Sequence, residues 1–264
     1  MGFTKNKVRR TKLQLKLDDY KLLAQKLKII PYKKKYMYFF GPIELPINLN
    51  GEIIIFNWYT WFVHNEKWSL KKTLEKLPSL SQNESQQSTV LIYGDFENSE
   101  MAKVRLHSIC HTGDIFGSEK CDCGIQLKLS LQKIYQAGTG ALFYLSNHEG
   151  RGIGLFSKSM TYVLQQKGYT TLEANLLLGY KVECRDYEEA SYLLKTLRNK
   201  PIILLTNNPD KINNLKQSGI AIESCENVIG EVNQFNIKYL ETKVNDMNHS
   251  FKLVKEDEKC IQGH

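Results

Sequence analysis

Two strand-like apolar runs indicate consecutive strands in the N-terminal third of the chain. From about Tyr38 the sequence becomes strand-like, with the segments YMYFFGPIELPI and GEIIIFNWYTWFV. The turn residues of Asn48 to Gly51 separate them. Two strand-like runs joined by a short turn of this composition predict a β-hairpin.

A longer block, from Thr89 to about Glu223, alternates strand-like and helical periods. Its strand-like runs are VLIYGDF, KVRLHSI, GALFYLS and PIILLTN. Helical spacing of apolar residues falls between these runs, around Leu127 to Tyr135, Leu155 to Lys167 and Tyr187 to Leu197. This alternation predicts an α/β or α+β core built on a mixed sheet.

The pattern also suggests boundaries. Residues 1–37 form a basic arm with one helical stretch, residues 38–225 the core domain with its β-rich N-terminal part, and residues 226–264 a polar tail ending in KLVKEDEKCIQGH. Within the core, residues 66–88 combine the short helical pattern WSLKKTLEKL with the polar run SLSQNESQQS. We expect an insertion that ends in a mobile loop there, and a frayed C-terminus.

Composition narrows the class of protein. With 264 residues, 42% hydrophobic and 24% charged, the chain can bury a large core, which excludes disorder throughout. Its apolar runs are shorter than the roughly 18 to 20 residues of a membrane-spanning helix. The basic N-terminus lacks the apolar stretch of a secretory signal. The sequence therefore predicts a cytoplasmic protein without a membrane partner.

The chain carries a net charge of +8, concentrated in KNKVRRTKLQLK and YKKKY near the N-terminus. Such an excess favours polyanionic partners, either nucleic acid or a nucleotide triphosphate. A solvated arm that only raises solubility explains it equally well. Since no RNA-binding or zinc-finger signature accompanies the charge, nucleic acid is the weaker candidate.

Three of the six cysteines lie within fourteen residues, in RLHSICHTGDIFGSEKCDCG. Cys110, Cys121 and Cys123 have the spacing C-x10-C-x-C. Three thiolates can bind zinc and leave a fourth tetrahedral position open, as in catalytic zinc sites. Two alternatives remain: a set of buried reduced thiols, or a closed structural site with His107 or His111 as fourth ligand.

Two further segments could approach phosphates. SNHEGRGIGLFSK follows an apolar run and contains Glu149, Gly150 and Arg151, so backbone N–H groups and a guanidinium can reach an anion there. LLTNNPDK places Thr206 and Lys211 after a buried-strand pattern. Each segment alone is also an ordinary strand-to-helix turn.

Taken together and in this order, RLHSICHTGDIFGSEKCDCGIQL, NHEGRGIGL, GYTTLEAN, ECRDY and LLTNNPDK resemble the GTP cyclohydrolase II family. The resemblance covers roughly Gly41 to Glu223, interrupted by the 66–88 insertion. It implies a homodimeric hydrolase of cyclic amidine C–N bonds with one zinc ion per chain. The enzyme would open the imidazole ring of GTP and, with magnesium, release formate and pyrophosphate. Its product, 2,5-diamino-6-hydroxy-4-(5-phosphoribosylamino)pyrimidine, begins riboflavin synthesis.

The resemblance also implies roles for individual residues. The zinc ligands would be Cys110, Cys121 and Cys123. Tyr162 and an arginine matching Arg185 would be catalytic, the arginine attacking the α-phosphate. A guanidinium stays protonated and is a poor nucleophile, so a purely electrostatic role for Arg185 is the physical alternative. Nucleotide contacts would come from Arg105, Leu106, His107, Ser108, Gln126, Glu149, Gly150, Arg151, Thr171, Thr206 and Lys211.

Two positions depart from the family pattern. Glu183 replaces the usual aspartate, the proton acceptor two positions before the arginine, and a base displaced by about 1 Å can cost on the order of a hundredfold in rate. Ile109 replaces a glutamate directly before the first zinc cysteine, which removes a carboxylate. A specialised homologue that opens the ring without completing the reaction is therefore one alternative. A non-catalytic zinc protein that binds nucleotide or RNA is another.

Overall fold

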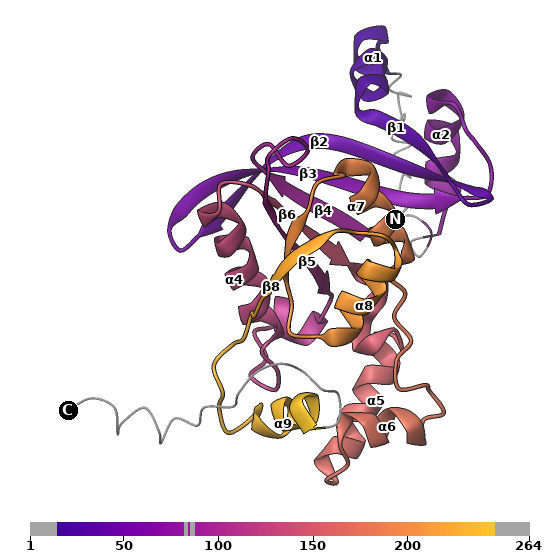
Figure 1. The fold of residues 1–264 in the computed structure, drawn as a ribbon. Helices are drawn as coiled ribbons and strands as arrows, with labels where there is room; N and C mark the ends of the chain where they lie inside the picture. Colours follow the sequence, from indigo (N-terminus) through magenta and orange to yellow (C-terminus); the bar gives the residue numbers. More distant parts are fainter. Residues whose placement is uncertain (1–14, 82–83, 85–87, 246–264) are drawn as a thin grey trace, which may run out of the picture.

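The computed structural model describes residues 15–81, 84 and 88–245. Residues 1–14 of the basic arm, part of the polar run in the insertion and residues 246–264 of the tail lie outside these ranges. Eight strands form one mixed sheet in the order β1-β2-β3-β4-β6-β5-β7-β8 (Figure 1). The strands are β1 (Leu27–Tyr32), β2 (Lys35–Leu49), β3 (Glu52–His64), β4 (Ser88–Tyr93), β5 (Ala102–Ser108), β6 (Gly140–Leu145), β7 (Ile202–Leu205) and β8 (Ile222–Glu226). The predicted fold class is confirmed.

The predicted hairpin is present as β2 and β3, which pair antiparallel from Tyr36↔His64 to Leu49↔Glu52. Its turn is formed by Asn50 and Gly51, both with positive φ, and the Gly51 amide donates to Asn48 Oδ1 at 2.8 Å. Strand β1, within the range expected to be an arm, pairs with β2 and extends the same sheet.

The helices are α1 (Leu17–Lys26), α2 (Leu70–Lys76), α4 (Cys123–Gln136), α5 (Leu155–Gln166), α6 (Thr171–Leu177), α7 (Glu188–Leu197), α8 (Pro209–Gln217) and α9 (Ile237–Asn245). The helical periods predicted within the core correspond to α4, α5 and α7, and the short pattern in the insertion to α2. In contrast, α9 lies in the segment expected to be a polar tail. No helix among the described residues is long and apolar enough to cross a membrane.

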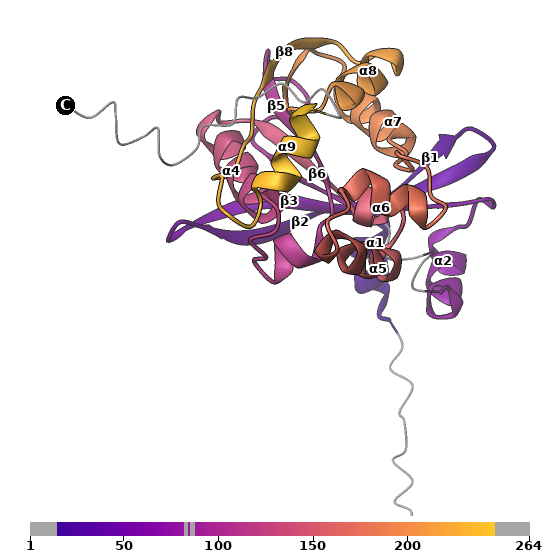
Figure 2. The same ribbon diagram turned by 90° about the horizontal axis from the view of Figure 1, so that it is seen from below.

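Helices cover both faces of the sheet, as the apolar periodicity requires. One face packs Leu131 and Ile134 of α4 against Phe56 and Leu142. On the other face, α7 and α8 contribute Leu193 and Leu215 to the larger core cluster. The strands β6, β5, β7 and β8 run parallel, so their carboxyl ends meet at one edge of the sheet. Helices α5, α6 and α9 gather at that end of the molecule (Figures 1 and 2).

Candidate active site

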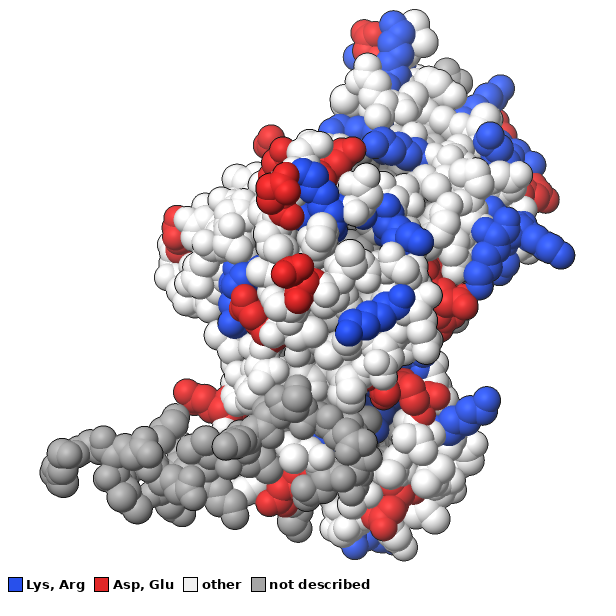
Figure 3. Space-filling view, in the orientation of Figure 1, with Lys and Arg blue, Asp and Glu red and all other residues white. Residues whose placement is uncertain are grey.

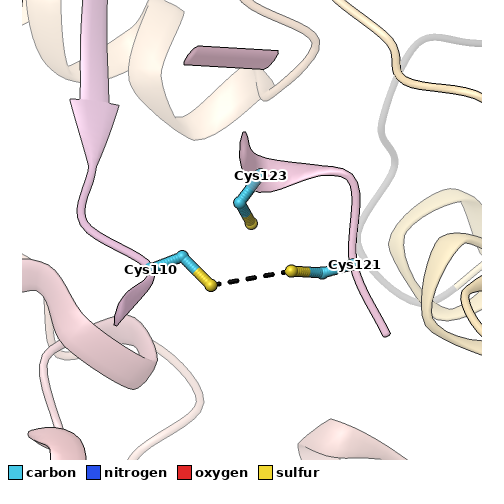
Figure 4. A group of neighbouring side chains, drawn as sticks. All are labelled: Cys110, Cys121 and Cys123. Atoms are coloured by element: carbon cyan, nitrogen blue, oxygen red, sulfur yellow. Dashed lines mark hydrogen bonds between the residues drawn. The ribbon is translucent and has the colours of Figure 1, made fainter. Parts of the chain in front are cut away.

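The three clustered cysteines meet at the carboxyl end of β5 (Figure 4). Cys110 follows β5, Cys121 lies in the next loop, and Cys123 begins α4. Their sulfur atoms all lie within 4.8 Å of one another, and Cys110 Sγ is 3.6 Å from Cys121 Sγ. Two sulfurs on one tetrahedral zinc, each at about 2.3 Å, would be roughly 3.8 Å apart. The donor set and its spacing therefore fit a zinc ion.

A glycine makes this convergence possible. Gly113 lies in the short π-helical turn η2 (His111–Ile115) between the first two cysteines. A Cβ at Gly113 would lie 2.9 Å from Cys121 Sγ and 3.2 Å from Cys110 Sγ. Only glycine leaves room for the sulfurs to approach each other at this point.

The Asp114 carboxylate holds the backbone of Cys110 in place. Its Oδ2 accepts from the Cys110 amide at 2.9 Å and from the Tyr144 hydroxyl at 3.0 Å, and its carboxylate lies 3.1 Å from His107 Nε2. Because an ionised carboxylate only accepts, His107 Nε2 carries the proton. Burial lowers the pKa of His107, so the ring is neutral. Its Nδ1 is a buried acceptor without a partner among the described residues.

The thiol cluster favours a thiolate at Cys110. Hydrogen bonds from the Cys121 and Cys123 thiols lower the pKa of the Cys110 thiol, and the Lys158 ammonium, 3.2 Å from its sulfur, acts in the same direction. Lys158 also binds Glu149 Oε1 at 2.6 Å, and Glu149 Oε2 accepts from the His111 amide at 2.6 Å. The glycine-rich segment is thus bonded directly to the cysteine loop.

The proposed fourth protein ligands point elsewhere. His107 is bonded to Asp114, and the His111 ring packs edge-on against Phe116, with centroids 4.9 Å apart. Among the described residues, the three cysteines alone form a group with metal-binding geometry. The arrangement therefore favours the three-ligand interpretation, with one coordination position open.

A pocket of about 1100 Å³, its open mouth included, extends from the cysteines between α5, α6 and α9. Three cationic side chains line it: Arg105, Arg151 and Lys211. Arg105 and Lys211 are buried, and Arg151 is partly buried. None of these three takes part in an ion pair within the described part of the chain. Burial lowers the pKa of each of them, which indicates that their charges are poorly compensated. An anionic ligand would supply the missing negative charge.

Arg185 differs from these cations because a carboxylate holds it. Glu183 Oε1 accepts from Arg185 Nε at 2.8 Å, and its other oxygen bonds Nη2. Burial opposes the charged guanidinium, but nearby Tyr187 and Glu183 outweigh it and raise the pKa of Arg185. Arg185 Nη1 lies 3.5 Å from Ser108 Oγ, at the pocket wall.

Most of the expected site residues line this one pocket, although three do not. The Leu106 side chain packs in the core while its carbonyl accepts from Lys211 Nζ at 2.8 Å, and Thr206 Oγ1 accepts from the Asn208 amide at 3.1 Å. Glu183 is paired with Arg185 and does not itself line the pocket. Those on the pocket wall are Arg105, His107, Ser108, Cys110, Cys121, Cys123, Gln126, Glu149, Gly150, Arg151, Tyr162, Thr171, Arg185 and Lys211, together with Ile109 at the departure position.

Several pocket residues were missed by the sequence analysis. Asn175 and Gln165 line the pocket, and their buried Nδ2 and Nε2 atoms have no partner among the described residues. Tyr239 and Lys243 come from α9. Asn175 lies inside the quoted segment GYTTLEAN, so a signal for it existed. The polar sequence around α9 contains no comparable signal for Tyr239 or Lys243.

The basic residues of YKKKY lie away from this pocket. Lys33, Lys34 and Lys35 are exposed at the turn between β1 and β2, and Lys33 pairs with Glu188. On the face shown in Figure 3, lysine and arginine side chains are interspersed with acidic ones. This distribution does not favour a nucleic-acid surface on that face.

Because His148 is buried, the free energy of unfolding should depend on pH. Its Nε2 donates to the Asp186 carbonyl at 2.8 Å, and burial lowers its pKa to about 3. Below the unfolded value of about 6.5, only the unfolded chain takes up this proton, so stability falls as pH drops from 6.5 toward 3. We expect wild type to lose roughly 2 kcal/mol more than His148→Gln between pH 7 and 5. Equal losses in urea unfolding at the two pH values would contradict this.

Comparison with known proteins gives one consistent result. The sequence profile described as GTP cyclohydrolase II matches residues 79–227. The riboflavin biosynthesis protein RibBA of Phocaeicola vulgatus is 43% identical over 181 residues, which cover 68% of this chain and 44% of that protein. The GTP cyclohydrolase-2 of Haemophilus influenzae is 45% identical over 161 residues, 60% of this chain and 74% of that protein. A monofunctional riboflavin biosynthesis protein RIBA 3 of Arabidopsis thaliana is 41% identical over 165 residues, 62% of this chain and 32% of that protein. The chain thus spans less than half of the longer relatives.

Proposed function

Because the chain belongs to the GTP cyclohydrolase II family, we propose that it hydrolyses GTP, opening the imidazole ring and releasing formate and pyrophosphate. The product would be 2,5-diamino-6-hydroxy-4-(5-phosphoribosylamino)pyrimidine, at the start of riboflavin synthesis. One observation carries the proposal: a thiol triad that could hold a metal ion shares a pocket with Arg105, Arg151 and Lys211, three cations without an ion-pair partner among the described residues, of which Arg105 and Lys211 are buried. That combination suits a substrate with a triphosphate and a ring to be hydrolysed.

The metal would be held by Cys110, Cys121 and Cys123. Bound there, zinc would supply Lewis acidity and an activated water at its open position. Carboxylates of the described residues form no comparable group. We therefore infer that magnesium would enter with the phosphates of the nucleotide.

For Tyr162 we propose a role at the reacting end of the substrate. Its hydroxyl lies 3.2 Å from Thr112 Oγ1, which is 3.6 Å from Cys110 Sγ. Burial raises the pKa of Tyr162, so the hydroxyl keeps its proton at neutral pH. We infer that Tyr162 donates this proton in a hydrogen bond to the base, beside the thiol triad.

The phosphate end of the pocket would be held by the buried cations. Arg105 is oriented by Gln126 Oε1, 2.6 Å from its Nη2, and by the Leu205 carbonyl, 2.8 Å from its Nη1. Lys211 is fixed by the Leu106 carbonyl. Such preorganised charges stabilise phosphate oxygens without having to rearrange during the reaction.

For Arg185 we propose the electrostatic role. Glu183 keeps its guanidinium charged and oriented, which suits stabilisation of a departing pyrophosphate and opposes nucleophilic attack. The longer glutamate therefore need not act as the proton acceptor in this chain. It reaches the guanidinium through two oxygens and also accepts from the Arg185 amide at 2.8 Å.

Product analysis tests the proposal. The zinc-loaded protein is incubated with GTP and magnesium, and formate, pyrophosphate and the pyrimidine are quantified by mass spectrometry. Formate and pyrophosphate in equal amounts would support the full reaction despite Ile109. Ring opening without one of these products would support the specialised homologue. Absence of turnover, with salt-sensitive RNA binding, would support the binding protein instead.

We also propose that the protein forms a homodimer through α5 and α6. Phe156 is 80% exposed, and Val163, Leu176 and Leu177 are each more than half exposed on the same pair of helices. Large exposed apolar side chains gathered in one region mark interaction surfaces. Phe156→Glu should therefore shift the protein toward monomer in size-exclusion chromatography with light scattering. The control is Ile53→Glu, at an exposed apolar position on β3; a dimer unaffected by Phe156→Glu would contradict this interface.

A further inference from the structure

The C-terminal helix α9 forms part of the pocket wall, although it lies beyond residue 227, where the family match ends. Seen from below in Figure 2, α9 lies between α4 and α6. Tyr239 and Lys243 are four residues apart and so share one helical face. Both line the pocket, and Lys243 Nζ lies 4.3 Å from the centroid of the Tyr239 ring.

Lys243 forms a buried ion pair with the residue between two of the cysteines. Its Nζ is 2.8 Å from Asp122 Oδ1, and the two side chains are 10% and 1% exposed. The other carboxylate oxygen accepts from Gln126 Nε2 at 2.5 Å and faces the Gly230 amide at 3.5 Å. Asp122 is therefore held from α9, from α4 and from the segment after β8.

The Lys243–Asp122 pair lies next to the metal loop, the segment that carries Cys121 and Cys123, and can restrain its conformation. The backbone that carries Cys121 and Cys123 passes through Asp122, so an anchored Asp122 carboxylate restrains the backbone from which both cysteine side chains project. A buried carboxylate whose cation is removed becomes an uncompensated charge, which drives local rearrangement. Groups that orient metal ligands from the outer shell typically change metal affinity or activity by about 10- to 100-fold when they are mutated.

The same contacts extend to the substrate pocket. Gln126 donates to Asp122 through Nε2, and through Oε1 it accepts from Arg105 Nη2 at 2.6 Å. Gln126 therefore links Asp122 to Arg105 by two hydrogen bonds. A substitution at Lys243 that moves Asp122 can change the position of Arg105 as well. No other side chain among the described residues forms an ion pair with Asp122.

We propose that Lys243 is a positioning residue, whose ammonium holds Asp122 and thereby keeps Cys121 and Cys123 in the geometry that binds the metal. This inference rests on the metal site of the proposed function. It assigns α9 a role in the site: the C-terminal segment completes the support of the metal loop.

Zinc release tests the inference without depending on turnover. Lys243→Met, Lys243→Arg and the neutral double variant Asp122→Asn/Lys243→Met are loaded with zinc, and release to a chromogenic chelator is followed well below each variant's Tm. Lys103→Met is the matched control, because it breaks a lysine–carboxylate pair with Glu226 at 2.7 Å, away from the cysteines. GTP turnover is measured in parallel to separate kcat from KM.

Lys243→Met and the double variant should release zinc about 10- to 100-fold faster than wild type. Lys243→Arg and Lys103→Met should stay within about threefold. The double variant removes the buried unpaired charge, so it keeps the test valid if Lys243→Met fails to fold. Wild-type release rates in the double variant would overturn the inference, even if its Tm is lower. If wild type itself binds no zinc, the proposed metal site fails instead.

Discussion

Cys121→Ser is expected to abolish both zinc binding and ring opening of GTP. Cys121 Sγ lies 3.6 Å from Cys110 Sγ, and a hydroxyl is a much weaker zinc ligand than a thiolate. The loss of activity should exceed the roughly 100-fold that outer-shell changes cause. Zinc content by mass spectrometry and formate release measure the two effects on the same sample.

The chain offers a matched control for this substitution. Cys225 is exposed on β8, outside the pocket, so Cys225→Ser should keep its zinc and its full activity. If Cys121→Ser retains zinc and turns over GTP as wild type does, the thiol triad is not the metal site.

Arg185→Ala should leave zinc bound but lower turnover by about 10²- to 10³-fold, the usual cost of removing one preorganised donor from a charge-stabilising site. Arg185→Lys keeps the charge but loses the fork that Glu183 holds, so an intermediate rate is expected. The measurements are kcat and KM for GTP, with separate quantification of formate and pyrophosphate.

The separate products make this prediction specific. If Arg185 stabilises departing pyrophosphate, its release should fall more than formate release does in Arg185→Ala. Loss of zinc from this variant, or turnover within about fivefold of wild type, would contradict the role assigned to Arg185.

The sequence predicted those parts of the molecule that depend on local pattern. Strand-like apolar runs separated by turn residues identified the β2–β3 hairpin, and helical periods identified α4, α5 and α7. The cysteine spacing predicted that the three thiols come together, and in the structure they do. The cysteines are close in sequence, and the short π-helical turn with Gly113 lets their sulfur atoms approach one another.

Contacts between distant segments could not be predicted in this way. The Lys243–Asp122 pair joins residues 121 positions apart, and nothing in the polar sequence of α9 indicates that two of its side chains enter a pocket. The Asp114 carboxylate shows the same limit at short range. Its bonds to the Cys110 amide and to His107 depend on the shape of the η2 turn, which the apolar pattern does not encode.

The consequence of having Glu183 in place of aspartate could not be predicted from the sequence. The sequence alone predicted that the extra methylene would displace a general base. In the structure, both carboxylate oxygens are engaged by Arg185. At Ile109 an aliphatic side chain lies in the pocket wall, and the nearby cysteine loop is held by carboxylates from Glu149 and Asp114.

A zinc titration of metal-free protein, with the initial rate of formate release from GTP measured at each step, tests the thiol triad directly. If the triad holds the catalytic metal, the rate should rise in proportion to zinc, reach a plateau at one ion per chain, and stay at zero throughout for Cys121→Ser. A rate that is independent of added zinc, or full activity in the metal-free protein, would contradict the assignment of the thiol triad as the catalytic metal site.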